Sequence, residues 1–162
     1  MALRLALIGS QSLVEKSFNI ISARDDISIT AIAVPIVGLR RFFRTKLEGL
    51  SIEELKVRDI NDFEFASKIQ SACDLILNVD SFQIFGPQYF NDNSPLIINF
   101  HYGKIPEFRG LDIPTWVIWK DEIRATASWH VVEPSIDSGK VLVEVEVEVG
   151  EKTAGEVTKD LM

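Results

Sequence analysis

Cysteine is nearly absent from this sequence, as are long apolar runs and a surplus of positive charge. Of 162 residues, one is cysteine, 17 are lysine or arginine and 24 are aspartate or glutamate, so the formal net charge is -7. The single Cys73 excludes an internal disulfide and fits a small core residue better than a redox centre. No apolar run approaches the roughly 18 residues of a membrane-spanning helix, and the start of the chain lacks the pattern of a secretory signal.

These absences also bear on location and partners. A nucleic acid is usually bound by a face rich in lysine and arginine, so the net charge of -7 disfavours a nucleic-acid partner. Without a membrane segment or an export signal, we expect a protein of the cytoplasm. A chain of 162 residues is long enough for one hydrophobic core, and we expect residues 1–162 to form a single domain.

Short apolar runs that alternate with helical patterns predict an α/β fold. Four such runs read as buried strands, at residues 3–8, 27–34, 74–79 and 96–100. Ser12 followed by Glu15 predicts a capped helix start, and Asn61 followed by Glu64 predicts another. Residues 38–55 show no clean period and are expected to form a loop or an irregular helix. Strands separated by helices in this way predict an open, mainly parallel sheet.

The last quarter of the sequence alternates strictly. Valine stands at every odd position from 141 to 149, and glutamate stands at positions 144, 146 and 148. This pattern predicts a strand with one buried and one wet face, added antiparallel at an edge of the sheet. Because alternate carboxylates on an exposed strand commonly keep an edge soluble, we expect no metal site there.

Polar residues that end an apolar strand stand where open α/β sheets bind ligands. Asn99 and His101 end the run 96–100 at a spacing of two, which sends both side chains to the same side of an extended strand. An imidazole can take a proton from a nucleophile near neutral pH, and an asparagine amide can donate to a developing oxyanion. The pair has the parts for acyl transfer. A structural role, with His101 capping the strand and Asn99 satisfying a turn, explains these two residues equally well.

A longer pattern surrounds this pair. Asn99-Phe100-His101 is followed by Pro106 and Gly110, and further along by Asp137-Ser138-Gly139. This series resembles the formyltransferases that use N10-formyltetrahydrofolate, which carry Asn-x-His-x-Ser-Leu-Leu-Pro-x-x-x-Gly and a later loop that ends in Asp-(Thr/Ser/Gly)-Gly. The resemblance extends over essentially the whole chain, through the further similar positions 57–62, 74–76 and His130.

The resemblance implies a Rossmann-like formyltransferase domain with Asn99, His101 and Asp137 as its catalytic residues. In the chemistry of that family, His101 would accept a proton from the attacking amine, Asn99 would stabilise the oxyanion, and Asp137 would orient the imidazole. Taken alone, Asp137 reads as a loop carboxylate in an Asx turn before Gly139. His130, on an apolar strand, reads as a structural histidine.

The same resemblance implies N10-formyltetrahydrofolate as the formyl donor. The residues expected to bind this cofactor are Phe82, Ile84, Phe85, Glu133 and Ser135. Several positions depart from the family pattern. Residues 103–105 replace the usual Ser-Leu-Leu, Phe82 stands where glycine is usual, and Glu133 with Pro134 replaces an acidic pair. We therefore expect a narrower pteridine pocket and an altered loop after His101.

The leading hypothesis is formyl transfer to a primary amine on an amino sugar, a nucleotide precursor, or an aminoacyl carrier protein of a peptide synthetase. One alternative is hydrolysis of N10-formyltetrahydrofolate, since the same three residues can activate water. Another is a non-catalytic domain with a structural or assembly role. Because residues 153–157 resemble the start of the family's next helix and the chain ends at Met162, we expect a domain cut short there or excised from a larger protein, with neighbouring domains as partners.

Overall fold

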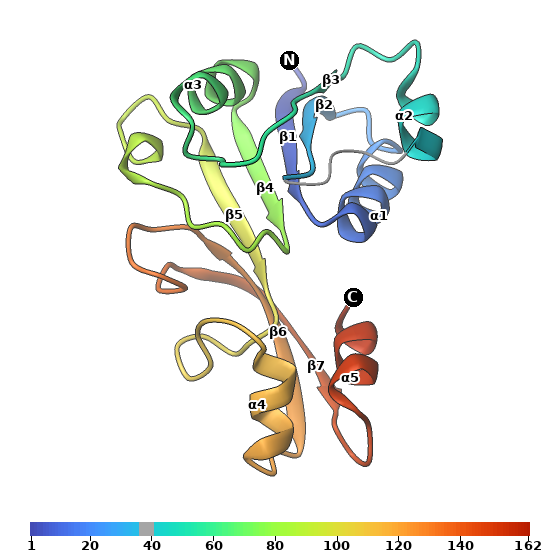
Figure 1. The fold of residues 1–162 in the computed structure, drawn as a ribbon, viewed down its shortest axis with the longest axis vertical. Coiled ribbons are helices and arrows are strands. Elements are labelled where there is room, and N and C mark those ends of the chain that lie inside the picture. The colour runs from blue at the N-terminus through green and yellow to red at the C-terminus, as the bar shows by residue number, and fades with distance from the viewer. Residues whose placement is uncertain (36–40) are drawn as a thin grey trace. The chain divides into compact units, whose positions relative to one another are not determined.

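Within residues 1–35 and 41–162, which the computed structural model describes, seven strands follow the order β3-β2-β1-β4-β5-β6-β7 (Figure 1). The predicted open, mainly parallel α/β sheet with an antiparallel edge strand near the C-terminus is confirmed. The chain divides into two compact units, residues 1–98 and 99–162, and each is described by itself.

The first unit contains β1 (Leu3–Gly9), α1 (Gln11–Ile21), β2 (Ile27–Ala33), α2 (Arg41–Leu47), β3 (Glu53–Glu54), α3 (Phe63–Ala72), β4 (Leu75–Val79) and the 3-10 turn η1 (Pro87–Tyr89). Strand β5 (Leu96–His101) begins in the first unit and ends in the second. The second unit continues with α4 (Ile113–Trp119), β6 (Arg124–Val131), β7 (Val141–Glu148) and α5 (Ala154–Leu161).

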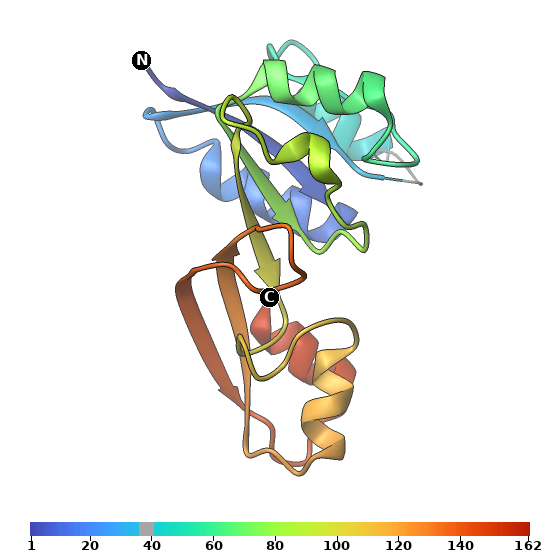
Figure 2. The same cartoon turned by 90° about the vertical axis from the view of Figure 1, so that its left-hand side faces the viewer.

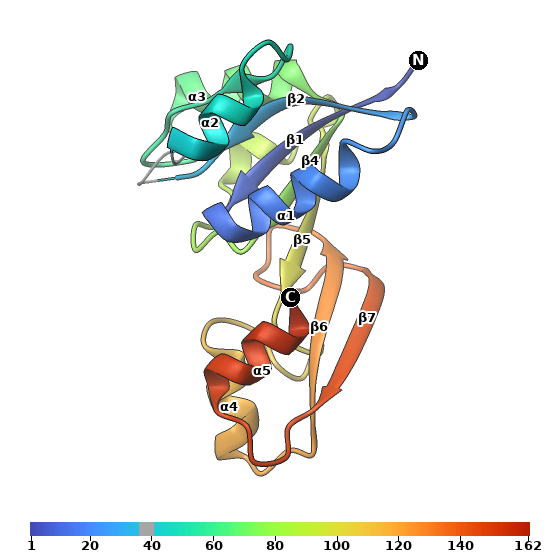
Figure 3. The same cartoon turned by 90° about the vertical axis from the view of Figure 1, so that its right-hand side faces the viewer.

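The first unit is built around β1. This strand pairs in parallel with both β2 and β4, and β2 pairs in parallel with β3. Figures 2 and 3 show α1 and α3 on opposite faces of these strands. A strand covered on both faces must be apolar on both, and the continuous run from Leu5 to Ile8 is buried accordingly. Cys73 is also part of this core, where burial raises the pKa of its thiol to about 11 and makes it a poor nucleophile.

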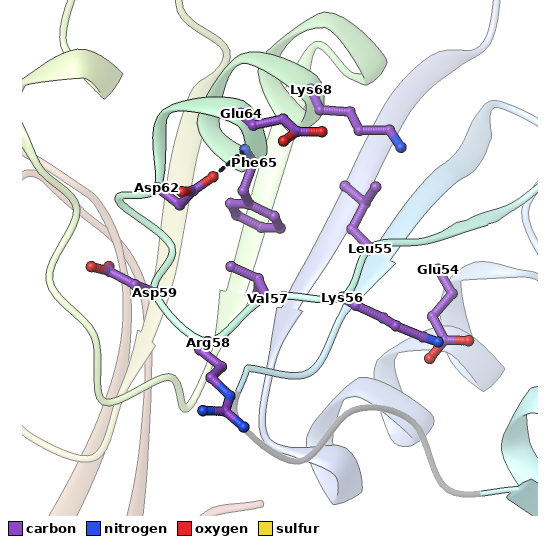
Figure 4. A pocket seen from close by; sticks show the side chains of 10 residues that line it. All are labelled: Glu54, Leu55, Lys56, Val57, Arg58, Asp59, Asp62, Glu64, Phe65 and Lys68. Carbon is purple, nitrogen blue, oxygen red and sulfur yellow. Dashed lines mark hydrogen bonds between the residues drawn. The ribbon is translucent and has the colours of Figure 1, made fainter.

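Both predicted helix starts in this unit are wrong by one or two residues. Helix α1 follows Ser10 directly, and Ser12 lies inside its first turn. In α3 the cap is Asp62, whose carboxylate accepts the Phe65 N–H at 3.0 Å (Figure 4). Asn61 does not cap the helix because its side chain bonds to another segment, accepting from Gly86 N at 2.6 Å.

The stretch predicted as a loop or irregular helix holds two short regular elements. These are α2 and β3, and Arg44 joins them by two bonds of 2.7 and 2.6 Å to the carboxylate of Glu54. Residues 38–40 of that stretch lie outside the described residues. Within the described part of the chain, the helices are all too short or too polar to span a membrane.

A tyrosine fixes the loop between β4 and β5 to the loop before α3. The Tyr89 ring is buried against Phe85, and its hydroxyl donates to the backbone oxygen of Ile60. We predict that Tyr89→Phe lowers the free energy of unfolding by about 1–3 kcal/mol, because it leaves that carbonyl buried without its donor. Urea denaturation of both proteins measures the difference. A change below about 0.5 kcal/mol would show that water replaces the hydroxyl.

The second unit pairs β6 with β7 in antiparallel register, with Ala127 opposite Val145 and Trp129 opposite Val143. The prediction that the valine face of β7 is buried is wrong for the middle of the strand, where Val143 is 54% and Val145 51% exposed. These valines are exposed because α5 packs against only part of β7. Val149, after which the chain turns, is buried. Helix α5 begins after Thr153, which caps it, and Glu156 completes a capping box.

Candidate active site

Four polar side chains converge in the second unit, where β5 ends beside β6. Asn99 and His101 come from β5, His130 from β6, and Asp137 from the loop between β6 and β7. His101 Nδ1 lies 3.6 Å from Asp137 Oδ2, and His130 Nε2 lies 3.5 Å from Asp137 Oδ1. Asn99 Nδ2 is 3.1 Å from His130 Nε2. The structure therefore brings all three predicted catalytic residues into one cluster and adds His130 to them.

The hydrogen bonds of His101 decide which of its nitrogens can accept a proton. Its Nε2 lies 2.7 Å from the backbone oxygen of Phe108, and a carbonyl oxygen only accepts, so Nε2 carries hydrogen. The neutral ring then has its lone pair on Nδ1, the nitrogen that faces Asp137. A proton taken up at Nδ1 would be held directly against the Asp137 carboxylate. His101 can thus act as a base whose charged form has a counter-ion in place.

His130 has a similar constraint with the opposite nitrogen. Its Nδ1 lies 2.9 Å from the Val131 carbonyl oxygen and must donate to it, so in the neutral ring Nε2 accepts from the Asn99 amide. This bond sets which end of the Asn99 amide points toward the histidine. The sequence-based view of His130 as a structural residue missed its place in this cluster. The similarity of His130 to a position of the family pattern was the available signal.

Asp137 links the two loops of the site. Its backbone lies in the left-handed region, with φ 44, and its Oδ2 accepts the backbone N–H of Gly110 at 2.9 Å. The sequence suggested an Asx turn for Asp137, but its carboxylate instead accepts a hydrogen bond from the loop after β5. Burial alone would raise the pKa of Asp137. The contact with His130, the N–H of Gly110 and the nearby His101 ring outweigh it and hold the pKa below its usual value.

The lowered pKa of Asp137 predicts an acid-sensitive contribution to stability. A carboxyl with a lowered folded-state pKa stabilises the fold above its unfolded value of about 3.9, and this contribution is lost as pH falls through the folded pKa. We expect Asp137→Asn to unfold with a flatter pH dependence between about pH 4 and pH 2 than the parent. Urea unfolding at several pH values measures this. Asp112→Asn, at an exposed loop position that is also left-handed with φ 56, controls for the loss of one carboxyl. Equal slopes for parent and Asp137→Asn would contradict the prediction.

Two glycines of the loop after β5 are required by the geometry around His101. Gly110 has φ 96, which favours glycine, and offers its N–H to Asp137. A side chain at Gly103 would place its Cβ 2.3 Å from the Phe108 oxygen and 2.5 Å from His101 Nε2. Gly103 stands where the family pattern has serine, and a serine Cβ would not fit at these distances without a shift of the loop. The Phe108 carbonyl and the Gly110 amide are backbone groups that side-chain patterns do not reveal.

The five residues expected to bind folate fall in both units. In the first unit, Phe82 and Ile84 are 74% and 60% exposed, whereas Phe85 is buried against Tyr89. Gln83 between them points the other way and bonds to Ile60 N at 2.7 Å. In the second unit, Glu133 and Ser135 are exposed on the loop that carries Asp137. The role of these five residues stays a prediction.

Comparison with known proteins defines the class of fold. No family model matches the sequence. No curated protein sequence matches it either. Among solved structures, the phosphoribosylglycinamide formyltransferase of Anaplasma phagocytophilum matches with a TM-score of 0.85 and 22% identity, over 99% of this chain and 80% of that one. A 4-N formyltransferase of Francisella tularensis matches with a TM-score of 0.78 and 21% identity, over 98% of this chain and 62% of that one.

A third match is the sugar N-formyltransferase of a Shewanella species, with a TM-score of 0.75 and 19% identity. The match covers 99% of this chain and 63% of the Shewanella chain. The doubly wound α/β sheet with an antiparallel end is therefore a formyltransferase fold. This confirms the fold that the resemblance in sequence implied, Rossmann-like and of the formyltransferase type.

Proposed function

We propose that this protein is an enzyme that transfers a formyl group from N10-formyltetrahydrofolate to a primary amine of a small or carrier-bound substrate. The observation that carries the proposal is the cluster of Asn99, His101 and Asp137, in which the one basic nitrogen of His101 faces a carboxylate. The fold and the sequence pattern around these residues support the same chemistry. Amino sugars, nucleotide precursor amines and aminoacyl carrier proteins are the acceptors to consider, the last as tailoring in a peptide synthetase.

The folate donor would supply an electrophilic formyl carbon when bound. Exposed Phe82 and Ile84, which alternate with the anchored Gln83, leave apolar side chains open, as a flat aromatic ring requires. On the second unit, Glu133 and Ser135 would offer polar groups from the Asp137 loop. Each pair fits one part of the chemistry of a folate: the apolar pair suits an aromatic face, and the polar pair suits groups that donate or accept hydrogen bonds.

The reaction would use the chain's own groups in the following way. His101 Nδ1 would accept the proton that the amine loses as it attacks, and Asp137 would stabilise the resulting imidazolium. The Asn99 amide, oriented by His130, would donate a hydrogen bond to the formyl oxygen as negative charge develops on it. The proton held on His101 Nδ1 would then pass to the leaving nitrogen as the bond between the formyl carbon and N10 breaks, so the products would be the formylated amine and tetrahydrofolate.

The test is a formyl-transfer assay of the purified chain with N10-formyltetrahydrofolate and each class of acceptor. Formylated amine produced in step with tetrahydrofolate supports the proposal. Formate release that does not depend on an amine would select the hydrolase alternative. Calorimetry with the folate alone separates a third outcome, because a non-catalytic domain of structural role would bind no folate. A carrier or adenylation domain encoded next to this segment would favour a carrier-bound acceptor.

A further inference from the structure

Strand β7 forms one edge of the sheet, and its outer side has no partner strand within the described part of the chain. In Figures 2 and 3, β6 runs along one side of β7, and no other strand lies along the other side. A free edge exposes backbone N–H and C=O groups to which a further strand can bind. Three apolar side chains add to this surface, since Leu142, Val143 and Val145 are 45%, 54% and 51% exposed.

The hydrogen bonds between β6 and β7 indicate which backbone groups of β7 point outward. The Val149 N–H donates to the Ile123 oxygen at 2.9 Å, in the same register as the neighbouring pairs of the two strands. In an antiparallel pair, hydrogen-bonded and non-hydrogen-bonded positions alternate along each strand. The valines at odd positions therefore direct their backbone groups toward β6. The backbone groups of Glu144, Glu146 and Glu148 point toward the free edge.

One contact at the end of β7 agrees with this direction. The Glu148 carbonyl oxygen accepts a hydrogen bond from the Lys152 ammonium at 2.6 Å, a group of the segment after β7 and not of β6. Lys152 also binds Asp160 at 3.0 Å, which balances its charge. Since the lysine covers this end of the edge, the open part of the edge is centred on Glu144 and Glu146.

The side chains of the glutamates give this edge a negative row. Glu144 accepts a hydrogen bond from Ser128 at 3.3 Å, and Glu146 binds Arg124 at 2.9 Å. The ion pairs of the described residues bring the Arg124 cation to a row that also contains Glu144 and Glu148, so an excess of negative charge remains. Because side chains alternate with a period of two, the exposed valines lie on the opposite face of the strand.

We propose that the outer edge of β7 binds an extended segment of a partner protein in which basic and apolar residues alternate, added as an antiparallel strand. The backbone of this segment would exchange hydrogen bonds with Glu144 and Glu146. Its lysine or arginine side chains would lie opposite the glutamates, and its apolar side chains would cover Val143 and Val145. Directly opposite charges stabilise a strand pair and like charges destabilise it, so the acidic row selects a basic partner.

The experiment is an NMR titration of the ¹⁵N-labelled chain with the peptide Lys-Val-Lys-Val-Lys-Val-Lys, acetylated and amidated at its ends. We expect a dissociation constant of about 1 mM or below. At about ten times that concentration, solvent exchange of the Glu144 and Glu146 amide hydrogens should slow about tenfold, because the added strand accepts from them. The Val143 and Val145 amides, which face β6, are internal controls and should change little. Unchanged exchange of the two glutamate amides would overturn the proposal.

Three further peptides test the pattern and the backbone pairing. The block peptide Lys-Lys-Lys-Lys-Val-Val-Val has the same composition without alternation and should bind about fivefold more weakly or less. The alternating peptide with N-methyl groups on its lysines keeps its charge but lacks the donors that face β7, so it should protect no amide. Glu-Val-Glu-Val-Glu-Val-Glu imitates a second copy of β7 and should not bind. Equal binding of the alternating and block peptides, or binding of the acidic peptide, would contradict the proposal.

A variant tests the role of the charge. Glu144→Gln keeps an oxygen that can accept from Ser128, and it should weaken binding of the alternating lysine peptide about twofold to fivefold. Glu122→Gln, at an exposed position of the same unit, is the matched control and should bind like the parent. If Glu144→Gln also binds like the parent, the acidic row does not select the partner and the proposal is wrong. The titration measures binding alone, so its result is independent of formyl transfer.

Discussion

His101→Gln is expected to lower the rate of formyl transfer by about 10²- to 10⁴-fold, the range that a positioned general base supplies. Glutamine can keep the hydrogen bond that Nε2 of His101 donates to the Phe108 oxygen, so the buried carbonyl stays satisfied. It cannot take up a proton at the position of Nδ1, which faces Asp137. The substitution thus removes the base while preserving the contact that packs the loop. Steady-state kinetics with saturating folate and amine measures the loss in kcat.

The control measurement for His101→Gln is whether the variant still folds like the parent. The circular dichroism spectrum and the thermal midpoint of His101→Gln should match those of the parent, whereas His101→Ala should also lose stability because the Phe108 carbonyl loses its donor. A His101→Gln protein that keeps kcat within about threefold of the parent would mean that His101 is not the base. His130→Gln offers a comparison, since it removes the partner of the Asn99 amide without touching His101.

Gly139→Ala is expected to lower the free energy of unfolding by about 3 kcal/mol or more and to abolish activity with it. A Cβ at this position would lie 1.8 Å from the backbone oxygen of Val131 on β6, a distance that neither chain segment can relieve by rotating a side chain. Either β6 or the loop must move. The loop carries Asp137, so its contacts with His101 and His130 would be lost.

Gly155→Ala is the matched control in the same unit. No atom lies within 4 Å of a Cβ at Gly155, which is in the first turn of α5, and alanine there should stabilise the protein by about 0.4–1 kcal/mol. Urea denaturation of both variants gives the comparison. If Gly139→Ala unfolds at the parent's urea midpoint, the close approach of the loop to Val131 does not exist in solution.

The strands could be predicted from sequence more reliably than the helix starts, for a physical reason. A strand buried on both faces, such as β1, requires a continuous apolar run, and few other structures produce one. A helix cap requires only a short polar residue, and several candidates usually stand nearby. Asn61 was the wrong choice because Gly86, distant in sequence, uses its side chain. Tertiary contacts of this kind leave no local pattern.

The residues of the candidate site also differ in how well the sequence predicts them. Asn99 and His101 could be predicted from the polar end of an apolar strand, because a spacing of two on extended backbone sets their direction. Asp137 depended on the family pattern alone, since a loop aspartate has many structural uses. His130 was underestimated because one histidine on a strand gives no sign of what the next strand presents. The Phe108 and Gly110 backbone groups have no side-chain signature at all.

The half-exposed valines of β7 would ordinarily invite a second copy to add its own β7 to the edge of the sheet. Side chains alternate with a period of two, so a two-fold, antiparallel pairing that sets valine beside valine also sets glutamate beside glutamate. Glu144, Glu146 and Glu148 of one molecule would then face the same row of the other. Repulsion between the two acidic rows therefore opposes the pairing of this edge with a copy of the same chain, while the valines stay accessible to the solvent.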